Sequence, residues 1–167
     1  MLYRVTDQLV WGGWGDLKDA ITAGCNAVIN VGIPPSLYFP GSQFYRLHTH
    51  DYNSNSVPYP ASVPPEFIKT LYFHDNDPFP VNLVKEAVKT VEDWTRQGRR
   101  VFVHCLEGNS RSVTVIFSWL VKTGMSIEEA EKQIIALKPC WTVGGHETGE
   151  EMRIRGWVKR DLEKYLE

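Results

Sequence analysis

A nine-residue stretch, His104 to Ser112, holds a cysteine and an arginine between two apolar segments of the sequence. The segment before it, RRVFVH, predicts a buried strand, and the segment after it, SVTVIFSWLVKTG, predicts a buried helix. Ligands of open α/β sheets bind at the carboxyl ends of strands, and helix N-termini offer unpaired N–H groups and a positive dipole end. The stretch therefore predicts an anion-binding turn.

The side chains within this turn add chemistry to the anion site. Gly108, Asn109 and Ser110 are small enough for the backbone to curl its amides inward as a nest. Inward amides and Arg111 favour the thiolate form of Cys105, which is the reactive nucleophile. The planar guanidinium of Arg111 can hold two oxygens of a phosphoryl group at once, as lysine could not.

This pattern resembles the signature loop of the cysteine-based protein tyrosine phosphatase superfamily. The matching residues are His104, Cys105, Gly108, Arg111 and Ser112. Glu107 and the Ser-Arg-Ser sequence are most similar to the dual-specificity branch. A weaker resemblance extends over most of the chain, through LVWGG, AGCNAVINVG and GMSIEEAEKQIIALKP.

The resemblance implies a role for each side chain of the loop. Cys105 attacks phosphorus and forms a phosphocysteine, and Ser112 stabilises the thiolate that leaves during hydrolysis. His104 braces the loop by hydrogen bonding rather than transferring protons. The residues expected to bind the phosphoryl oxygens are Leu106, Glu107, Gly108, Asn109, Ser110 and Arg111.

The family also uses an aspartate, on a loop some thirty residues upstream, to protonate the leaving group. Asp75 precedes Cys105 by 30 residues and Asp77 precedes it by 28. The family's acid follows an apolar strand residue by two positions, which favours Asp75, whereas the distance to Asn82 favours Asp77. Asp75 is the preferred general acid and Asp77 the alternative; either could merely cap the next helix. Asp51, 54 residues before Cys105, is a poorer third candidate.

A metal site is a weaker hypothesis. His48 and His50 share one face of an alternating segment, and His74 could complete a set of imidazole ligands. Their spacing is not specific, and the cysteine mechanism needs neither metal nor cofactor. We expect these histidines to lie on the surface or brace loops.

Strands alternate with helices along the chain. Expected strands are residues 3–13 with a turn at Thr6-Asp7, 26–32, 43–50, 70–75 and 99–104. Expected helices are 15–24, 82–98, 112–124, 127–138 with a Ser126/Glu129 capping box, and a final amphipathic helix burying Met152, Trp157, Val158, Leu162 and Tyr165. This order predicts one α/β domain over residues 1–167, with a central, mainly parallel sheet flanked by helices on both sides.

Two segments fit this plan less well. Residues 33–66 hold seven of the ten prolines and read as a long irregular excursion, whose aromatic side chains either wall the pocket or pin the loop. By analogy with the family, Gly144, Gly145 and Gly149 indicate a mobile segment near the pocket rim.

Bulk properties exclude several classes of protein. A formal net charge of −2 gives no global attraction to nucleic acid or an anionic membrane, and basic residues of the last helix alternate with acidic ones. The three cysteines form no CxxC pair, which fits a reducing compartment. The N-terminus lacks the apolar core of a signal peptide, and no apolar run reaches the roughly 18 residues that cross a bilayer. We expect a cytoplasmic monomer.

The loop composition narrows the expected substrate. Leu106, Glu107 and Asn109 add no positive charge, and a carboxylate here repels polyanions such as inositol lipids, RNA 5′ ends and pyrophosphates. The leading hypothesis is a shallow pocket for phosphotyrosine, with phosphoserine and phosphothreonine as further substrates on proteins. The same chemistry on a small phosphorylated metabolite or glycan is one alternative. A catalytically silent phosphate-binding module is another.

Overall fold

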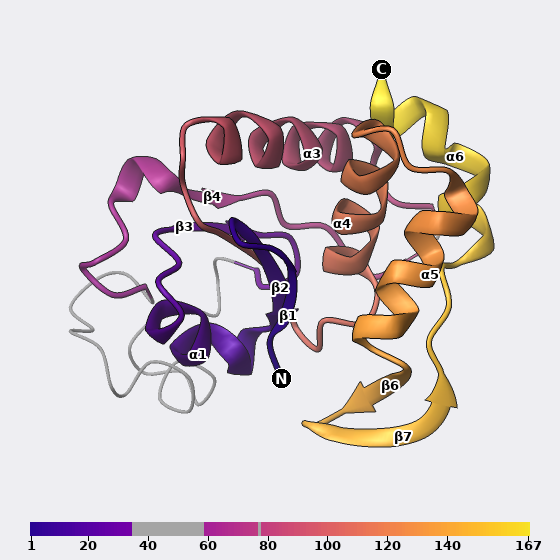
Figure 1. The fold of residues 1–167 in the computed structure, drawn as a ribbon, viewed down its shortest axis with the longest axis horizontal. Coiled ribbons are helices and arrows are strands. Elements are labelled where there is room, and N and C mark those ends of the chain that lie inside the picture. Colours follow the sequence, from indigo (N-terminus) through magenta and orange to yellow (C-terminus); the bar gives the residue numbers. More distant parts are fainter. Residues whose placement is uncertain (35–58, 77) are drawn as a thin grey trace.

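A five-stranded sheet forms the centre of the computed structural model, which describes residues 1–34, 59–76 and 78–167 (Figure 1). Its strand order is β1-β2-β5-β3-β4. The strands are β1 (Tyr3–Thr6), β2 (Leu9–Gly13), β3 (Ala27–Asn30), β4 (Ile68–Thr70) and β5 (Val101–Cys105). Only β1 runs antiparallel to its neighbour, so the sheet is mainly parallel, as the alternation of elements predicts.

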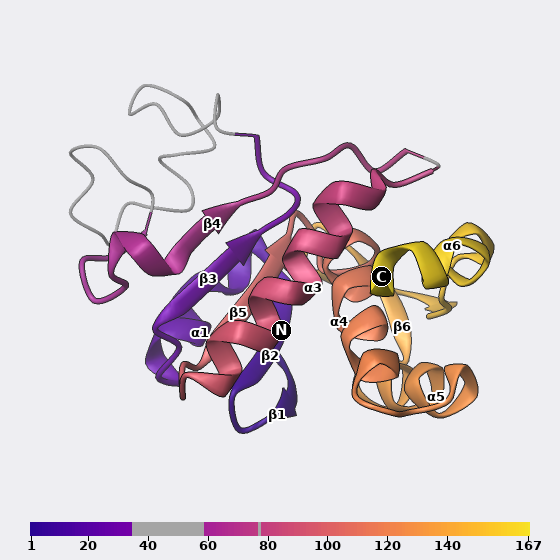
Figure 2. The same cartoon turned by 90° about the horizontal axis from the view of Figure 1, so that it is seen from above.

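Helices cover both faces of this sheet. One face carries a short 3₁₀ helix, η1 (Trp14–Asp16), and α1 (Leu17–Thr22). The other carries α3 (Val81–Arg96), α4 (Arg111–Lys122) and α6 (Gly156–Leu166), with α5 (Ile127–Leu137) packed on α4 (Figures 1 and 2). The expected α/β architecture is thus confirmed.

The central strand β5 contributes to both hydrophobic layers. All five of its residues are buried, because helices lie on both sides of it. Val101, Val103 and Cys105 pack with the α3 and α4 layer, whereas Phe102 packs with the α1 layer. Successive side chains of a strand point to opposite faces. Cys105 therefore ends the strand on the side where α4 begins.

One local sequence signal acts as expected, and a second does so only in part. Ser126 and Glu129 form the predicted capping box, since each side chain accepts the other residue's backbone N–H, at 3.1 Å and 2.9 Å. Met152 is buried as predicted but lies before α6, which begins only at Gly156.

The strand predicted over residues 70–75 is wrong in its bounds. Its partner β3 ends at Asn30, whose Oδ1 accepts the N–H groups of Gly32 and Ile33 at 3.0 Å and 2.8 Å. Beyond this point the Leu71 N–H still donates to the Asn30 carbonyl at 2.8 Å and the Phe73 N–H to the Val31 carbonyl at 3.4 Å, but the regular ladder has ended and β4 stops at Thr70. Most of the excursion after Ile33, including the strand expected at 43–50, lies outside the described residues.

Where the sequence suggested a mobile segment, the structure has a hairpin of β6 (Cys140–Val143) and β7 (His146–Glu151). Gly144 and Gly145 form its turn with φ of 57° and 85°. Two consecutive positive φ values are typical of a type I′ turn, for which Gly-Gly is a recognised signal. The Val-Gly-Gly-His sequence was therefore sufficient to predict this hairpin.

Gly32, two residues beyond the end of β3, lies directly against Cys105 at the end of β5. A Cβ there would lie 2.4 Å from Cα and Cβ of Cys105, whereas a Cβ at Gly15 would meet nothing within 4 Å. We expect Gly32→Ala to lower the free energy of unfolding by about 2 kcal/mol or more. Gly15→Ala, the matched control, should change it by less than about 1 kcal/mol. Urea denaturation measures both, and equal effects would contradict the tight contact.

Candidate functional site

The turn from His104 to Ser112, which we name the phosphate loop after its predicted ligand, joins the end of β5 to the start of α4. A pocket of about 130 Å³, which we name the phosphate pocket, borders this loop. The pocket is lined by Asp75, Cys105, Leu106, Glu107, Asn109, Ser110, Arg111 and Trp141. The structure thus brings the predicted nucleophile, the predicted guanidinium and the preferred acid to one cavity, although 30 residues separate Asp75 from Cys105.

Cys105 lies at the base of this pocket, with only 2% of its surface exposed. The N–H of Gly108 donates to Sγ at 3.2 Å, and the Ser112 hydroxyl lies 3.2 Å from the same atom. Both groups can donate to a sulfur anion. Two potential donors of the same turn therefore converge on the sulfur.

Arg111 fixes two distant segments next to the loop. Its Nη1 donates to the carbonyl oxygen of Phe73 at 2.9 Å and to that of Gly32 at 3.1 Å. Because Phe73 precedes Asp75 by two residues, Arg111 ties the acid-bearing segment to the phosphate loop. A guanidinium has five donors, and these two carbonyls use a single nitrogen.

His104 is fully buried beneath the loop. Its Nδ1 donates to the Cys105 carbonyl oxygen at 3.2 Å, and its Nε2 accepts from the Tyr59 hydroxyl at 2.8 Å. Burial lowers the pKa of His104 to about 3, and the positive charge of Arg111 adds to this, although the hydrogen bond to Cys105 acts in the opposite direction. The ring is therefore neutral at physiological pH and suited to bracing.

Gly108 lets the loop pack against the end of β2. Its φ of +74° is left-handed, and an added Cβ would lie 2.7 Å from the carbonyl carbon of Gly12. The indole N–H of Trp11 donates to the Gly108 carbonyl at 3.2 Å. The backbone N–H of Trp14 donates to the Leu106 carbonyl at 3.0 Å. The loop thus turns its carbonyls outward towards β2, as an amide nest requires.

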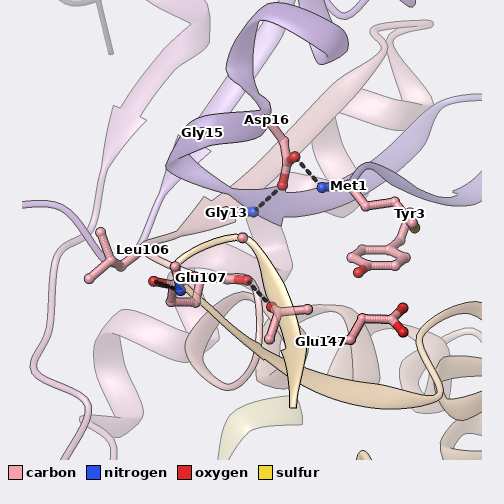
Figure 3. A pocket seen from close by; sticks show the side chains of 11 residues that line it. Met1, Tyr3, Gly13, Gly15, Asp16, Leu106, Glu107 and Glu147 are labelled. Atoms are coloured by element: carbon pink, nitrogen blue, oxygen red, sulfur yellow. Dashed lines mark hydrogen bonds and ion pairs between the residues drawn. The ribbon is translucent and has the colours of Figure 1, made fainter. Parts of the chain in front are cut away.

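The side chains of Glu107 and Asn109 point away from the phosphate pocket, towards the β6–β7 hairpin. Glu107 accepts the Gly144 N–H at 3.2 Å (Figure 3), and Asn109 exchanges hydrogen bonds with the Thr142 backbone. These two side chains therefore link the loop to the hairpin. Ser110 is buried, and its hydroxyl has no hydrogen-bond partner within the described part of the chain.

A second cavity of about 430 Å³ shares Leu106 and Glu107 with the phosphate pocket (Figure 3). Tyr3, Asp16 and Glu147 also line it. Asp16 accepts the Gly13 N–H at 2.8 Å and pairs with the amino group of Met1. Its walls are acidic, which sets it apart from the phosphate pocket.

Asp75 lies at the rim of the phosphate pocket with 41% of its side chain exposed. Its carboxylate is 3.8 Å from the guanidinium of Arg155. That guanidinium lies over the rings of Trp141 and Trp157, at 5.2 Å and 4.9 Å from their centroids. Arg155 thus precedes α6 and faces the site.

Several expected residues cannot be placed. Asp77, the alternative acid, lies outside the described residues, as do Asp51, His48 and His50. His74 is exposed, with its Nδ1 3.1 Å from the Tyr72 hydroxyl. Within residues 1–34, 59–76 and 78–167, no three His, Cys, Asp or Glu side chains gather as a metal site would require. None of the helices in those ranges is long and apolar enough to span a bilayer.

Sequence reasoning missed the residues that support the site from outside the loop. They are Gly32, Tyr59, Lys138, Trp141, Thr142 and Arg155. The Lys-Pro pair at the end of α5 belongs to a segment that resembles the family, and could have drawn attention to Lys138. Gly32 likewise ends the resembling segment AGCNAVINVG, and no local pattern marks the other four.

Comparison with known families and proteins gives a consistent result. The sequence model of the dual specificity phosphatase catalytic domain matches residues 26–144. Dual specificity protein phosphatase 1 of Arabidopsis thaliana is 38% identical over 55 residues, which cover 32% of this chain and 28% of that protein. Dual specificity protein phosphatase Mpk3 of Drosophila melanogaster is 29% identical over 122 residues, covering 65% of this chain and 30% of that protein. The matches therefore span less than a third of each curated relative.

Solved structures share the fold at low sequence identity. Human DUSP28 superposes with a TM-score of 0.65 at 19% identity, covering 98% of this chain and 91% of its own. PTPMT1 gives 0.68 at 17% identity, covering 99% and 94%. DUSP15 gives 0.64 at 18% identity, covering 98% and 86%.

The buried neutral His104 predicts a pH dependence of stability. Its pKa falls from 6.5 in the unfolded chain to about 3, so below pH 6.5 the unfolded chain binds a proton that the folded chain excludes. Stability therefore falls as the pH drops from 6.5 towards 3, by about 2 kcal/mol between pH 7 and pH 5 from this group alone.

Urea denaturation of a His104→Asn variant at pH 7 and pH 5 checks this. The loss of stability between the two pH values should be about 2 kcal/mol smaller than in the parent protein. His146→Asn, a control on the exposed hairpin, should keep the parent's loss. An equal loss in the parent and His104→Asn would refute the neutral assignment.

Proposed function

The chain belongs to the dual specificity phosphatase family, and we propose that it hydrolyses phosphomonoesters of proteins through a phosphocysteine at Cys105. Phosphotyrosine is the main substrate in this proposal, with phosphoserine and phosphothreonine as further ones. The observation that carries it is the single pocket in which Sγ of Cys105 accepts the Gly108 N–H, with Arg111 in the same wall.

In the first step, the sulfur anion of Cys105 attacks phosphorus opposite the leaving oxygen. A P–S bond forms while the P–O bond breaks, and the carboxyl group of Asp75 gives its proton to the leaving oxygen. The loop N–H groups and Arg111 hold the three other oxygens as their charge redistributes. The products are the dephosphorylated alcohol and phosphocysteine.

In the second step, water attacks the phosphocysteine. The Asp75 carboxylate takes a proton from this water, the P–S bond breaks, and inorganic phosphate leaves. The departing sulfur takes up the electron pair of that bond. The Ser112 hydroxyl, 3.2 Å from Sγ, then donates a hydrogen bond to the thiolate.

Asp75 must change partner during this cycle. Its carboxylate faces Arg155 in the structure, whereas the first step needs it next to the leaving oxygen. The ion pair with Arg155 is long, at 3.8 Å, and Asp75 is partly exposed. The side chain is therefore free to turn from Arg155 towards the leaving oxygen when a substrate is bound.

The charges around the pocket support a substrate with one phosphoryl group. Arg111 is the only cationic side chain among the described residues that line it, and Asp75 adds a carboxylate. The exposed Leu106 offers an apolar contact at the rim. An aromatic phosphoester gains from that contact, and Arg111 supplies the guanidinium that holds its one phosphoryl group.

Turnover of an aryl phosphate and of a phosphotyrosine peptide tests the proposal. Cys105→Ser should lower kcat about a thousandfold or more, because the nucleophile is lost. Cys140→Ser, a control at a half-buried cysteine outside the pocket, should retain the parent's rate. A chelator should leave turnover unchanged. Equal rates for Cys105→Ser and the parent would exclude the mechanism.

A substrate panel then separates proteins from small molecules. Phosphotyrosine, phosphoserine and phosphothreonine peptides are compared with sugar phosphates and other phosphometabolites at equal concentration. We expect the highest kcat/KM for the phosphotyrosine peptide. If no peptide is hydrolysed faster than in buffer while a metabolite is, the substrate class is wrong although the chemistry stands.

The assignment of the general acid has its own test. Asp75→Asn should slow hydrolysis of an ester with a poor leaving group about 100-fold or more, and slow that of p-nitrophenyl phosphate much less. Asp77→Asn is the comparison variant and should have a small effect on both. A large loss in Asp77→Asn alone would transfer the role to that residue.

A further inference from the structure

Lys138 is a buried lysine that the proposed mechanism does not use. It follows the last residue of α5 and precedes Pro139, and only 1% of its surface is exposed. A residue before proline is restricted to extended conformations, and Lys138 has φ of −135° and ψ of 89°. The chain therefore leaves the helix at Lys138, whose side chain reaches the phosphate loop.

All three N–H donors of the ammonium group find acceptors. Nζ donates to the carbonyl oxygen of Gly108 at 3.1 Å, to that of Glu107 at 3.4 Å and to the Thr142 hydroxyl at 3.2 Å. It also lies 4.9 Å from the centroid of the Tyr3 ring. Two of these three partners are thus carbonyls of the loop, in a place where a carboxylate would be the usual partner of a buried cation.

Two peptide groups of the loop are oriented by these contacts. In a trans peptide, the carbonyl and the N–H point in opposite directions. The carbonyl of the Glu107–Gly108 peptide faces Lys138, and its N–H donates to Sγ of Cys105. The carbonyl of the next peptide also faces Lys138, so the N–H of Asn109 points away from it.

The charges around Lys138 support an electrostatic interaction between its ammonium group and the Cys105 sulfur. Burial lowers the pKa of Lys138, and negative charge at Cys105, Asp16, Glu107 and Cys140 acts in the opposite direction. The ammonium group and the Cys105 sulfur lie at the two ends of the same peptide dipole. Each charge therefore stabilises the other through that dipole.

We propose that Lys138 is a positioning residue that holds the Glu107 and Gly108 carbonyls outward, so that the N–H groups of Gly108 and Asn109 stay directed at the sulfur and the bound phosphoryl group. It touches neither the nucleophile nor the substrate. This role rests on the proposed function of the loop. The end of α5 and the β6–β7 hairpin thus support the phosphate loop through Lys138 and Thr142.

Lys138→Met tests this, because methionine keeps the unbranched side chain and removes the charge. We expect kcat/KM for an aryl phosphate at pH 7 to fall about 10- to 100-fold, and inhibition by inorganic phosphate to weaken about tenfold. The rate at which iodoacetamide alkylates Cys105 should reach half its maximum about one pH unit higher than in the parent. Lys132→Met, at an exposed lysine of the same helix, should match the parent in all three.

A second variant, Thr142→Val, keeps the proposal testable if Lys138→Met does not fold. It deprives the ammonium group of one acceptor while the charge remains, so the same pH midpoint should rise by a smaller amount. Thermal unfolding identifies which variants are folded. An unchanged midpoint in a folded Lys138→Met overturns the proposal, and if that variant does not fold, an unchanged midpoint in Thr142→Val does so.

Alkylation also separates this inference from the proposed function, because it needs no turnover. A parent protein that hydrolyses no phosphoester but shows the shift in Lys138→Met would refute the phosphatase proposal and retain the role of Lys138. The reverse result would retain the phosphatase and refute the positioning role.

Discussion

The convergence of backbone N–H groups on one sulfur atom is the constraint on which the rest of this structure depends. Peptide groups can turn their N–H inward only if their carbonyls find partners on the outside of the loop. Trp11 and Trp14 provide donors from the end of β2 and from η1, and Lys138 provides a cation from the end of α5. The site is thus built from outside as much as from the residues that face the substrate.

The position of the loop between β5 and α4 follows from the same constraint. A parallel sheet buried on both faces leaves its strand ends as the accessible edge, where a buried helix can begin with its N–H groups facing the loop. Cys105 ends the central strand, and Arg111 opens the helix and binds the carbonyls of Gly32 and Phe73. Through Phe73 the segment carrying Asp75 is held next to the nucleophile. The neutral, buried His104 completes the support beneath it.

The loop's outward side chains explain how a carboxylate can belong to an anion site. Glu107 accepts the N–H of Gly144 and lines the acidic cavity, so its charge is directed away from the phosphate pocket. Glu107 should therefore repel polyanions that approach through the acidic cavity. Asp75, by contrast, faces the pocket, paired with an arginine that lies over two tryptophan rings. The rim therefore joins elements that are distant in sequence, including the hairpin and the segment before α6.

The sequence alone determined the helices, the central strands, the capping box at Ser126 and the strand-to-helix turn that carries Cys105 and Arg111, because hydrophobic periodicity, caps and turn residues act over a few positions. It also contained the Gly144-Gly145 hairpin signal, which was read as mobility. Tertiary structure decided where β4 ends, that Gly32 abuts Cys105, that Arg155 pairs with Asp75, and that Lys138 lies under the loop. These contacts join residues more than 25 positions apart, and no local pattern encodes them, because they depend on how strands pair and how helices pack onto the sheet.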